Sequence, residues 1–205
     1  MKKLTIIMIM VLMAAFFTTT VSAQGITAKG VKGGLNFAKF TGDDAEFGGI
    51  DPKTYTGFAI GGFLIYSLNE QLSIQPEVFY SRKGSEYKES TYGETIKLTM
   101  KMNYLDIPIL GVYRLRDNIR LFAGPSINFY LNGTSRVEVD GESEEGDIER
   151  EYTTSPDFGL VFGGSYLFNK IVIDARYSLG LRTLDDEGDE EIKHAVIQLM
   201  VGYLF

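Results

Sequence analysis

Few residues of this chain have side chains that could carry out catalysis. The sequence contains one histidine, His194, and no cysteine, which excludes thiol catalysis, disulfides and thiolate metal sites. His194 could act as the base of a Ser-His-acid group in a lipid hydrolase, but no spacing singles out a partner serine. A lone histidine beside a loop is more often a surface residue. We therefore predict that the protein is not an enzyme and has no catalytic residues.

Acidic residues are concentrated in two segments. Residues 138–151 contain eight carboxylates and residues 185–191 contain six, together 14 of the 27 acidic residues. Clustered carboxylates could bind a hard cation such as calcium, but the spacing from Asp185 to Asp189 does not match an EF-hand loop. We interpret both segments as solvated, mutually repelling surface and predict no metal site. No glycine-rich phosphate loop follows a strand and opens a helix, so we also predict no cofactor.

The charge and the N-terminus restrict the partners and the location. A formal net charge of −7 gives no electrostatic attraction to nucleic acid. Lys2 and Lys3 precede a run, residues 4–17, that is apolar apart from Thr5, and the small residues Val21-Ser22-Ala23 follow. This is the layout of a secretory signal peptide, and the run is short for a membrane span, which needs about 20 residues. We predict a cleaved signal peptide at residues 1–23 and one domain at residues 24–205.

From Gly25 onward the dominant hydrophobic period is two, which is typical of strands with two different faces. No stretch of residues 24–205 is long and apolar enough for a transmembrane helix, so a membrane-embedded form must be a closed barrel. We predict eight strands, at residues 30–40, 55–68, 72–82, 95–115, 120–131, 158–168, 171–183 and 192–205.

The predicted connections alternate between short and long. Short turns are expected near Asn69-Glu70, Asp117-Asn118 and Asn169-Lys170, and longer loops at residues 41–54, 83–94, 132–157 and 184–191. Outer-membrane barrels have short periplasmic turns and long external loops in this order. The sequence therefore predicts an all-β fold, an eight-stranded antiparallel up-and-down transmembrane β-barrel of the outer-membrane type.

Alternation alone does not show which face of the strands is in contact with water. In a soluble lipocalin-like barrel the apolar face would point inward, around a ligand. The membrane orientation is favoured because apolar faces of about five or six residues per strand match strands of 9–11 residues that cross a bilayer. Aromatic residues near strand ends also suit interfacial girdles: Tyr66, Tyr80, Tyr104, Tyr113, Phe129, Phe168 and Tyr203. The final Tyr203-Leu204-Phe205 resembles the C-terminal signal of outer-membrane barrels.

The polar face of the predicted strands carries charges. Glu77, Asp174, Arg176 and Arg182 would point into the lumen, and we expect them to pair with one another because unpaired buried charges are costly. Neighbouring glycines and serines would leave room for these long side chains. An eight-stranded barrel is only wide enough for side chains to fill it, so we interpret these residues as a structural plug rather than an ion path.

The predicted fourth strand changes parity along its length. One parity is shared by Leu98, Met100, Met102 and Tyr104, and the other by Ile107, Ile109 and Tyr113. A β-bulge produces such a change, and a proline is tolerated at a bulge. The pattern therefore predicts a bulge at Asp106-Ile107-Pro108.

Five short motifs occur in a recognisable order. They are Gly33-Gly34-Leu35-Asn36, Gln75-Pro76-Glu77 with Tyr80-Ser81-Arg82-Lys83-Gly84, Asn103-Tyr104-Leu105-Asp106-Ile107-Pro108, Ala123-Gly124-Pro125, and Arg176-Tyr177-Ser178-Leu179-Gly180-Leu181. As an ordered set they resemble the PorT-type outer-membrane β-barrel family common in Bacteroidota, over essentially all of residues 24–205. The resemblance implies the barrel fold and the outer-membrane location. It also implies a link to assembly of a protein secretion system, which is the role of the founding type.

The sequence leads to four hypotheses about function. The first is a non-enzymatic barrel, embedded in outer-membrane lipid, whose acidic external loops meet an envelope or extracellular protein. The second is a secretion-system accessory factor, the third a lipid-modifying enzyme that depends on His194, and the fourth a soluble lipocalin-like ligand binder. The sequence specifies no oligomeric state.

Overall fold

A computed structural model describes residues 26–91, 94–139, 142–148, 155–182 and 192–205. The predicted signal peptide and the acidic segment at residues 185–191 lie outside these ranges. The described residues form nine strands: β1 (Ile26–Thr41), β2 (Lys53–Ser67), β3 (Leu72–Thr91), β4 (Glu94–Arg114), β5 (Ile119–Val139), β6 (Glu142–Ile148), β7 (Asp157–Phe168), β8 (Ile171–Gly180) and β9 (Lys193–Leu204). Within the same ranges, no helix is long and apolar enough to cross a bilayer.

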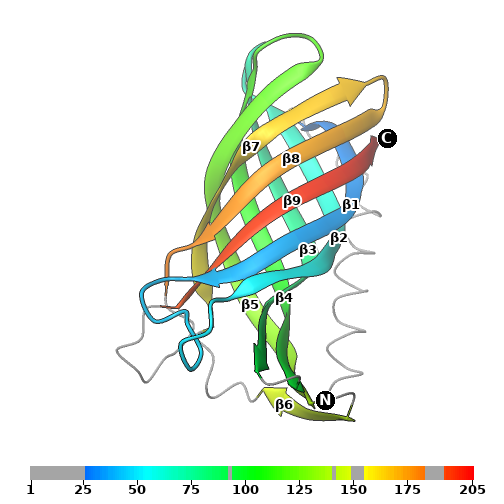
Figure 1. Ribbon diagram of the computed structural model, residues 1–205. Helices are drawn as coiled ribbons and strands as arrows, with labels where there is room; N and C mark the ends of the chain where they lie inside the picture. The colour runs from blue at the N-terminus through cyan, green and yellow to red at the C-terminus, as the bar shows by residue number, and fades with distance from the viewer. Residues whose placement is uncertain (1–25, 92–93, 140–141, 149–154, 183–191) are drawn as a thin grey trace.

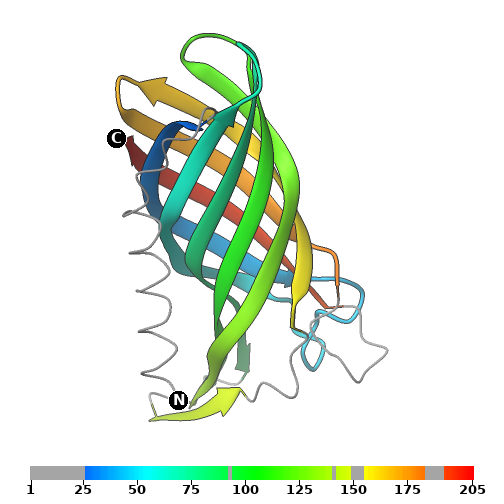
Figure 2. The same cartoon turned by 180° about the vertical axis from the view of Figure 1, so that it is seen from behind.

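Eight of the described strands close into a ring, which confirms the predicted barrel (Figures 1 and 2). The sheet order is β4-β3-β2-β1-β9-β8-β7-β5-β6, and an additional pairing between β4 and β5 joins the two ends of the ring. All of these pairings are antiparallel. β6 lies outside the ring, because it pairs with the outer third of β5, from Gly133 to Val139.

The two ends of the barrel differ, as the loop lengths predict. The short turns lie at one end together with the C-terminus, and the β1–β2 connection and β6 lie at the other (Figure 1). Asn69 supports the first short turn, because its side-chain oxygen accepts hydrogen bonds from the backbone N–H groups of Gln71 and Leu72. Asn169 supports another by adopting a φ of 53°, a left-handed conformation that asparagine tolerates better than most residues. Polar turn residues therefore set the short-turn end.

The outer wall of the barrel is apolar and the inner wall is largely polar. Apolar side chains of the predicted outward parity are exposed along several strands, including Leu72, Ile74, Phe158, Leu160, Phe162, Ile197, Leu199 and Val201. On the opposite parity Lys32, Asn36 and Glu77 are buried in the lumen. The lipocalin-like hypothesis, which needs an apolar lumen around a ligand, is therefore wrong.

The predicted bulge in the fourth strand is wrong. β3 and β4 keep one unbroken register from Leu72–Tyr113 to Thr91–Glu94. The register shift lies between β4 and β5, where the pair Asn103–Asn132 is followed by Tyr104–Tyr130, and the extra residue is Leu131 on β5. The apolar residues Leu98, Met102 and Tyr104 face the lumen, as does Asp106, which has the same parity on β4. These apolar side chains line an apolar part of the lumen. The predicted place of Tyr104 in an aromatic girdle is wrong for the same reason.

Two segments predicted as loops extend the strands beyond the ring. Most of residues 83–94 forms a hairpin between β3 and β4, and β5 and β6 occupy a large part of residues 132–157. Cross-strand contacts hold the first hairpin, including a salt bridge of 3.0 Å between Lys97 Nζ and Glu86 Oε2. Polar composition suggested loops here, but strands that leave the bilayer no longer need an apolar face.

Replacing Leu199 by Arg tests the lipid-facing wall. Leu199 is 51% exposed on β9, and a charge near the bilayer midplane should lower the free energy of unfolding by about 2–4 kcal/mol. Leu115→Arg is the matched control, because Leu115 is 54% exposed but follows the end of β4, where the cost should be about 0–1 kcal/mol. Urea unfolding in phospholipid vesicles, followed by gel mobility with and without boiling, measures both. If both variants lost the same free energy of unfolding, the assignment of Leu199 to the lipid-facing wall would be contradicted.

Candidate functional site

A network of four charged side chains occupies the middle of the lumen. Lys32 Nζ of β1 lies 3.0 Å from Glu77 Oε1 of β3 and 2.7 Å from Asp174 Oδ2 of β8. Arg176 of β8 donates to Glu77 Oε2 at 2.6 Å and also to Asp174. All four side chains are buried. The predicted pairing of Glu77, Asp174 and Arg176 is confirmed, and Lys32 balances the charge.

The strands bring these charges together across the barrel. β3 and β8 lie four strands apart in either direction around the ring, so the contact between Glu77 and Arg176 joins opposite walls. Glycines leave space for the long side chains: a Cβ on Gly202 would lie 2.6 Å from Lys32 Cγ, and one on Gly163 would lie 2.9 Å from Arg176 Cβ. The expected glycine neighbours are therefore a packing requirement of the network.

Arg182 is not part of this network, so its predicted lumenal position is wrong. It follows the end of β8, is exposed, and donates a hydrogen bond of 3.2 Å to the backbone oxygen of Pro156. The strand alternation that turns Asp174 and Arg176 inward does not continue past Gly180. Lys32 is not among the ion-pair partners predicted from the sequence, because its partners Glu77 and Asp174 are distant from it in sequence.

Further polar pairs extend from the network toward the long-loop end. Gln198 donates to the side-chain oxygen of Asn36 at 2.8 Å, and Asn36 donates to Ser81 Oγ at 2.9 Å. Beyond them, Lys83 Nζ lies 2.9 Å from Asp106 Oδ1. The polar side chains in this part of the lumen are thus bonded to one another, which is the condition for burying them at tolerable cost.

His194 is buried in the lumen, and its predicted surface position is wrong. The side chain is 3% exposed, and its Nε2 lies 3.1 Å from the Tyr104 hydroxyl. The ring also packs against Phe40, with the ring centroids 5.2 Å apart. The partner that the structure gives this imidazole is a phenol inside a packed lumen, not a serine at a surface open to lipid. The hypothesis of a His194-dependent lipid hydrolase therefore has no support from this geometry.

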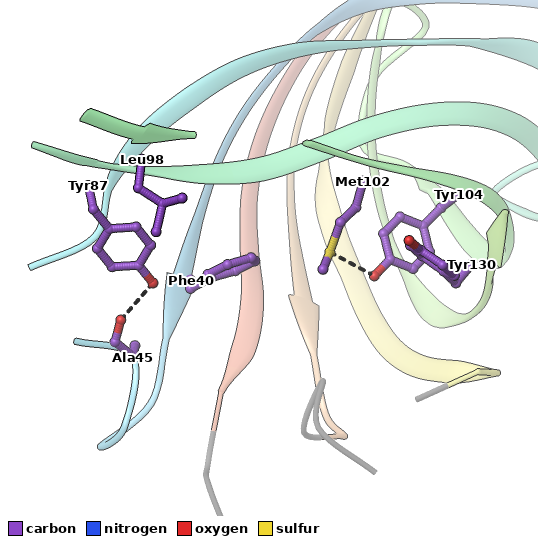
Figure 3. Packing of buried hydrophobic residues seen from close by; sticks show 7 residues of the cluster. All are labelled: Phe40, Ala45, Tyr87, Leu98, Met102, Tyr104 and Tyr130. Carbon is purple, nitrogen blue, oxygen red and sulfur yellow. Dashed lines mark hydrogen bonds between the residues drawn. The ribbon is translucent and has the colours of Figure 1, made fainter. Parts of the chain in front are cut away.

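An apolar cluster fills the lumen at the long-loop end (Figure 3). It consists of Phe40, Ala45, Tyr87, Leu98, Met102, Tyr104 and Tyr130. Ala45 belongs to the β1–β2 connection, and its backbone oxygen accepts a hydrogen bond of 2.8 Å from the Tyr87 hydroxyl. This bond holds the connection across the end of the lumen, so side chains occupy the lumen from the charged network to its outer end.

The β5–β6 hairpin carries a group of exposed carboxylates. Four carboxylates on β6 are exposed, namely Glu142, Glu144, Glu145 and Asp147. Among the described residues no group of three or more His, Asp or Glu side chains is arranged to hold a metal ion. Part of the first acidic segment and all of the second lie outside the described ranges. Where it is described, the acidic segment forms a strand rather than the predicted loop.

A closed ring with an apolar outer wall and a paired polar lumen defines a transmembrane β-barrel of the bacterial outer membrane. The chain matches the family model of the outer membrane protein beta-barrel domain over residues 23–186. The protein therefore belongs to this family and is located in the bacterial outer membrane. A comparison with curated protein sequences finds no significant match.

Two solved structures have a similar fold. Neisserial surface protein A is 13% identical, with a TM-score of 0.54, and the match covers 86% of this chain and 97% of that one. Ail, the attachment invasion locus protein of Yersinia pestis, is 18% identical, with a TM-score of 0.50, over 87% of this chain and 99% of that one. Ail was solved in complex with the heparin analogue sucrose octasulfate. At these identities the similarity shows the fold alone.

The charged network can be tested by removing one of its members. Glu77→Gln leaves Lys32 and Arg176 with one carboxylate fewer, and breaking a buried ion pair costs about 3–5 kcal/mol of the free energy of unfolding. The control is Glu70→Gln, because Glu70 is exposed between β2 and β3 and should have little effect. Adding Lys32→Met to Glu77→Gln should cost less than the sum of the single changes. Urea unfolding monitored by circular dichroism measures each variant, and strict additivity would argue against a network.

Proposed function

We propose that this protein is a non-enzymatic binding barrel, exported by its signal peptide at residues 1–23, that contacts an envelope or extracellular protein through its external hairpins. The observation that carries the proposal is the β5–β6 hairpin. β6 pairs with β5 only, so one of its backbone edges has no neighbouring strand among the described residues. Such an edge, displayed beyond the barrel (Figure 2), is a template for contacts with another chain.

The filled lumen supports this use of the external surface. The network around Glu77 and Arg176 spans opposite walls, and the cluster around Tyr87 closes the outer end. A solute would have to break buried salt bridges to pass, and breaking them is costly. Contacts with molecules outside the cell are therefore assigned to the hairpins rather than to a channel.

The charge of the hairpin indicates the chemistry of the partner. Glu142, Glu144 and Glu145 are exposed within four residues of β6. This negative surface favours a basic protein face, because complementary charge steers association and excludes partners of like charge. Ail was solved with a sulfated, anionic ligand, and the acidic β6 would repel a ligand of that kind. The proposed partner is thus a protein with a basic surface.

A role as an accessory factor of a secretion system is the second candidate, and it rests on the motif resemblance to PorT-type members. Several of the motif residues lie in the barrel itself: Glu77 and Arg176 belong to the charged network, and Asp106 pairs with Lys83. These residues act in barrel architecture, which every function of the barrel would share. The external hairpins therefore carry the proposal, and a secretion component is one partner they could bind.

Site-specific crosslinking tests the proposal. A photo-crosslinking residue at Gly146 would project into open space, since a Cβ there meets no atom within 4 Å. In intact cells it should capture a discrete protein. Replacing Glu142, Glu144 and Glu145 by Gln should reduce the yield several-fold, because the electrostatic attraction is lost.

The control variant removes the same amount of charge elsewhere on the external side. Asp43→Asn, Glu46→Gln and Asp51→Asn alter exposed residues of the β1–β2 connection and should leave the yield unchanged. Mass spectrometry identifies the captured protein. A secretion component would select the second candidate, whereas equal capture by both variants, or no capture at all, would contradict the hairpin proposal.

A further inference from the structure

We propose that the periplasmic mouth of the lumen binds an oxyanion of the phosphate type. A cavity of about 250 Å³ opens at the short-turn end, and its lining includes Arg114, Arg120, Thr27, Ser67 and Ser73. In outer-membrane barrels the short turns face the periplasm. This site is at the opposite end of the barrel from the hairpins and is independent of their proposed function.

The two arginines of this cavity are direct neighbours. Arg114 of β4 and Arg120 of β5 are paired in the antiparallel register, and both lie on the inward parity of their strands, in line with Val112 and Phe122. Like charges placed directly opposite each other destabilise a sheet, and the charge of Arg114 acts electrostatically on Arg120. Neither side chain forms a hydrogen bond or ion pair with any residue in the part of the chain that the structure describes.

Among the described residues that line the cavity, no carboxylate compensates these charges. Asp174 attracts Arg120 electrostatically, but it is already bonded to Lys32 and Arg176. The central network contains two cations and two carboxylates and is balanced on its own. The described lining of the cavity therefore carries two positive charges and no carboxylate, and a bound anion would neutralise these charges.

Hydroxyl groups complete the set of donors. Thr27 Oγ1 donates to the backbone oxygen of Ile65 at 3.2 Å and lies 2.9 Å from Ser67 Oγ, which lies 3.3 Å from Ser73 Oγ. A guanidinium offers a planar pair of donors that matches two oxygens of a phosphate, and a serine hydroxyl that turns away from its neighbour can donate to another oxygen. Two guanidiniums with serine hydroxyls beside them in one cavity thus favour a tetrahedral oxyanion. Its source can be free phosphate in the periplasm or the phosphate of a phospholipid headgroup in the inner leaflet.

The first arm of the test uses inorganic phosphate and the full barrel in maltoside micelles, which contain no phosphate. Calorimetric titration at constant ionic strength should show saturable binding to the unmodified protein that chloride does not reproduce. Arg114→Gln and Arg120→Gln should each weaken binding at least tenfold. Arg116→Gln is the matched control, because Arg116 lies between these two arginines in sequence but does not line the cavity, and it should bind as the unmodified protein does.

The second arm identifies the source of the phosphate. The barrel is exposed to mixed micelles containing phosphatidylglycerol, repurified, and analysed for retained lipid. The site would be assigned to a phospholipid headgroup if the unmodified barrel retains the lipid but does not bind inorganic phosphate. Arg114→Gln and Arg120→Gln should then lose the retained lipid. Boiling-dependent gel mobility confirms that each variant is folded, and either single variant suffices if the other does not fold. The proposal is overturned if neither probe binds, or if Arg116→Gln weakens binding as much as the cavity variants.

Discussion

The structure depends on the charged network that crosses the lumen. Glu77 and Arg176 stand on strands four positions apart around the ring, and Lys32 and Asp174 complete a balanced set. Each of these charges would be costly to bury alone, and each becomes tolerable only when its partners are in place. Because the partners come from β1, β3 and β8, the network forms only in a closed ring. Closure, register and a filled lumen are therefore coupled.

The barrel is organised in layers along its axis. Arginines and hydroxyls line the periplasmic mouth, paired charges and amides fill the middle, and an apolar cluster beneath the β1–β2 connection closes the outer end. Beyond that cluster the strands continue as hairpins with exposed carboxylates. The arginine-lined cavity and the acidic β6 thus differ in charge and are suited to different partners.

Alternation in the sequence was sufficient to predict most of the wall and part of the lumen. The eight ring strands, the short turns and the inward position of Glu77, Asp174 and Arg176 follow from period two and from turn residues. The predictions of strand face that were wrong concern β4, where the face toward the lumen and the face toward the lipid are both apolar. The apolar side chains of Leu98, Met102 and Tyr104 suggest a change of face along the strand, but they line the apolar part of the lumen. Hydrophobicity does not distinguish an apolar lumen from the outer wall.

The sequence by itself determined the fold class, the alternation along most strands and the residues available for ion pairs, because these depend on local patterns that each strand carries alone. Only the tertiary structure decided that Lys32 completes the central network, that His194 contacts Tyr104 inside the lumen, and that Arg114 and Arg120 share a cavity. Lys32 and Asp174 are 142 residues apart in sequence. Such partners meet because the ring closes with a particular register and stagger, which no local pattern encodes.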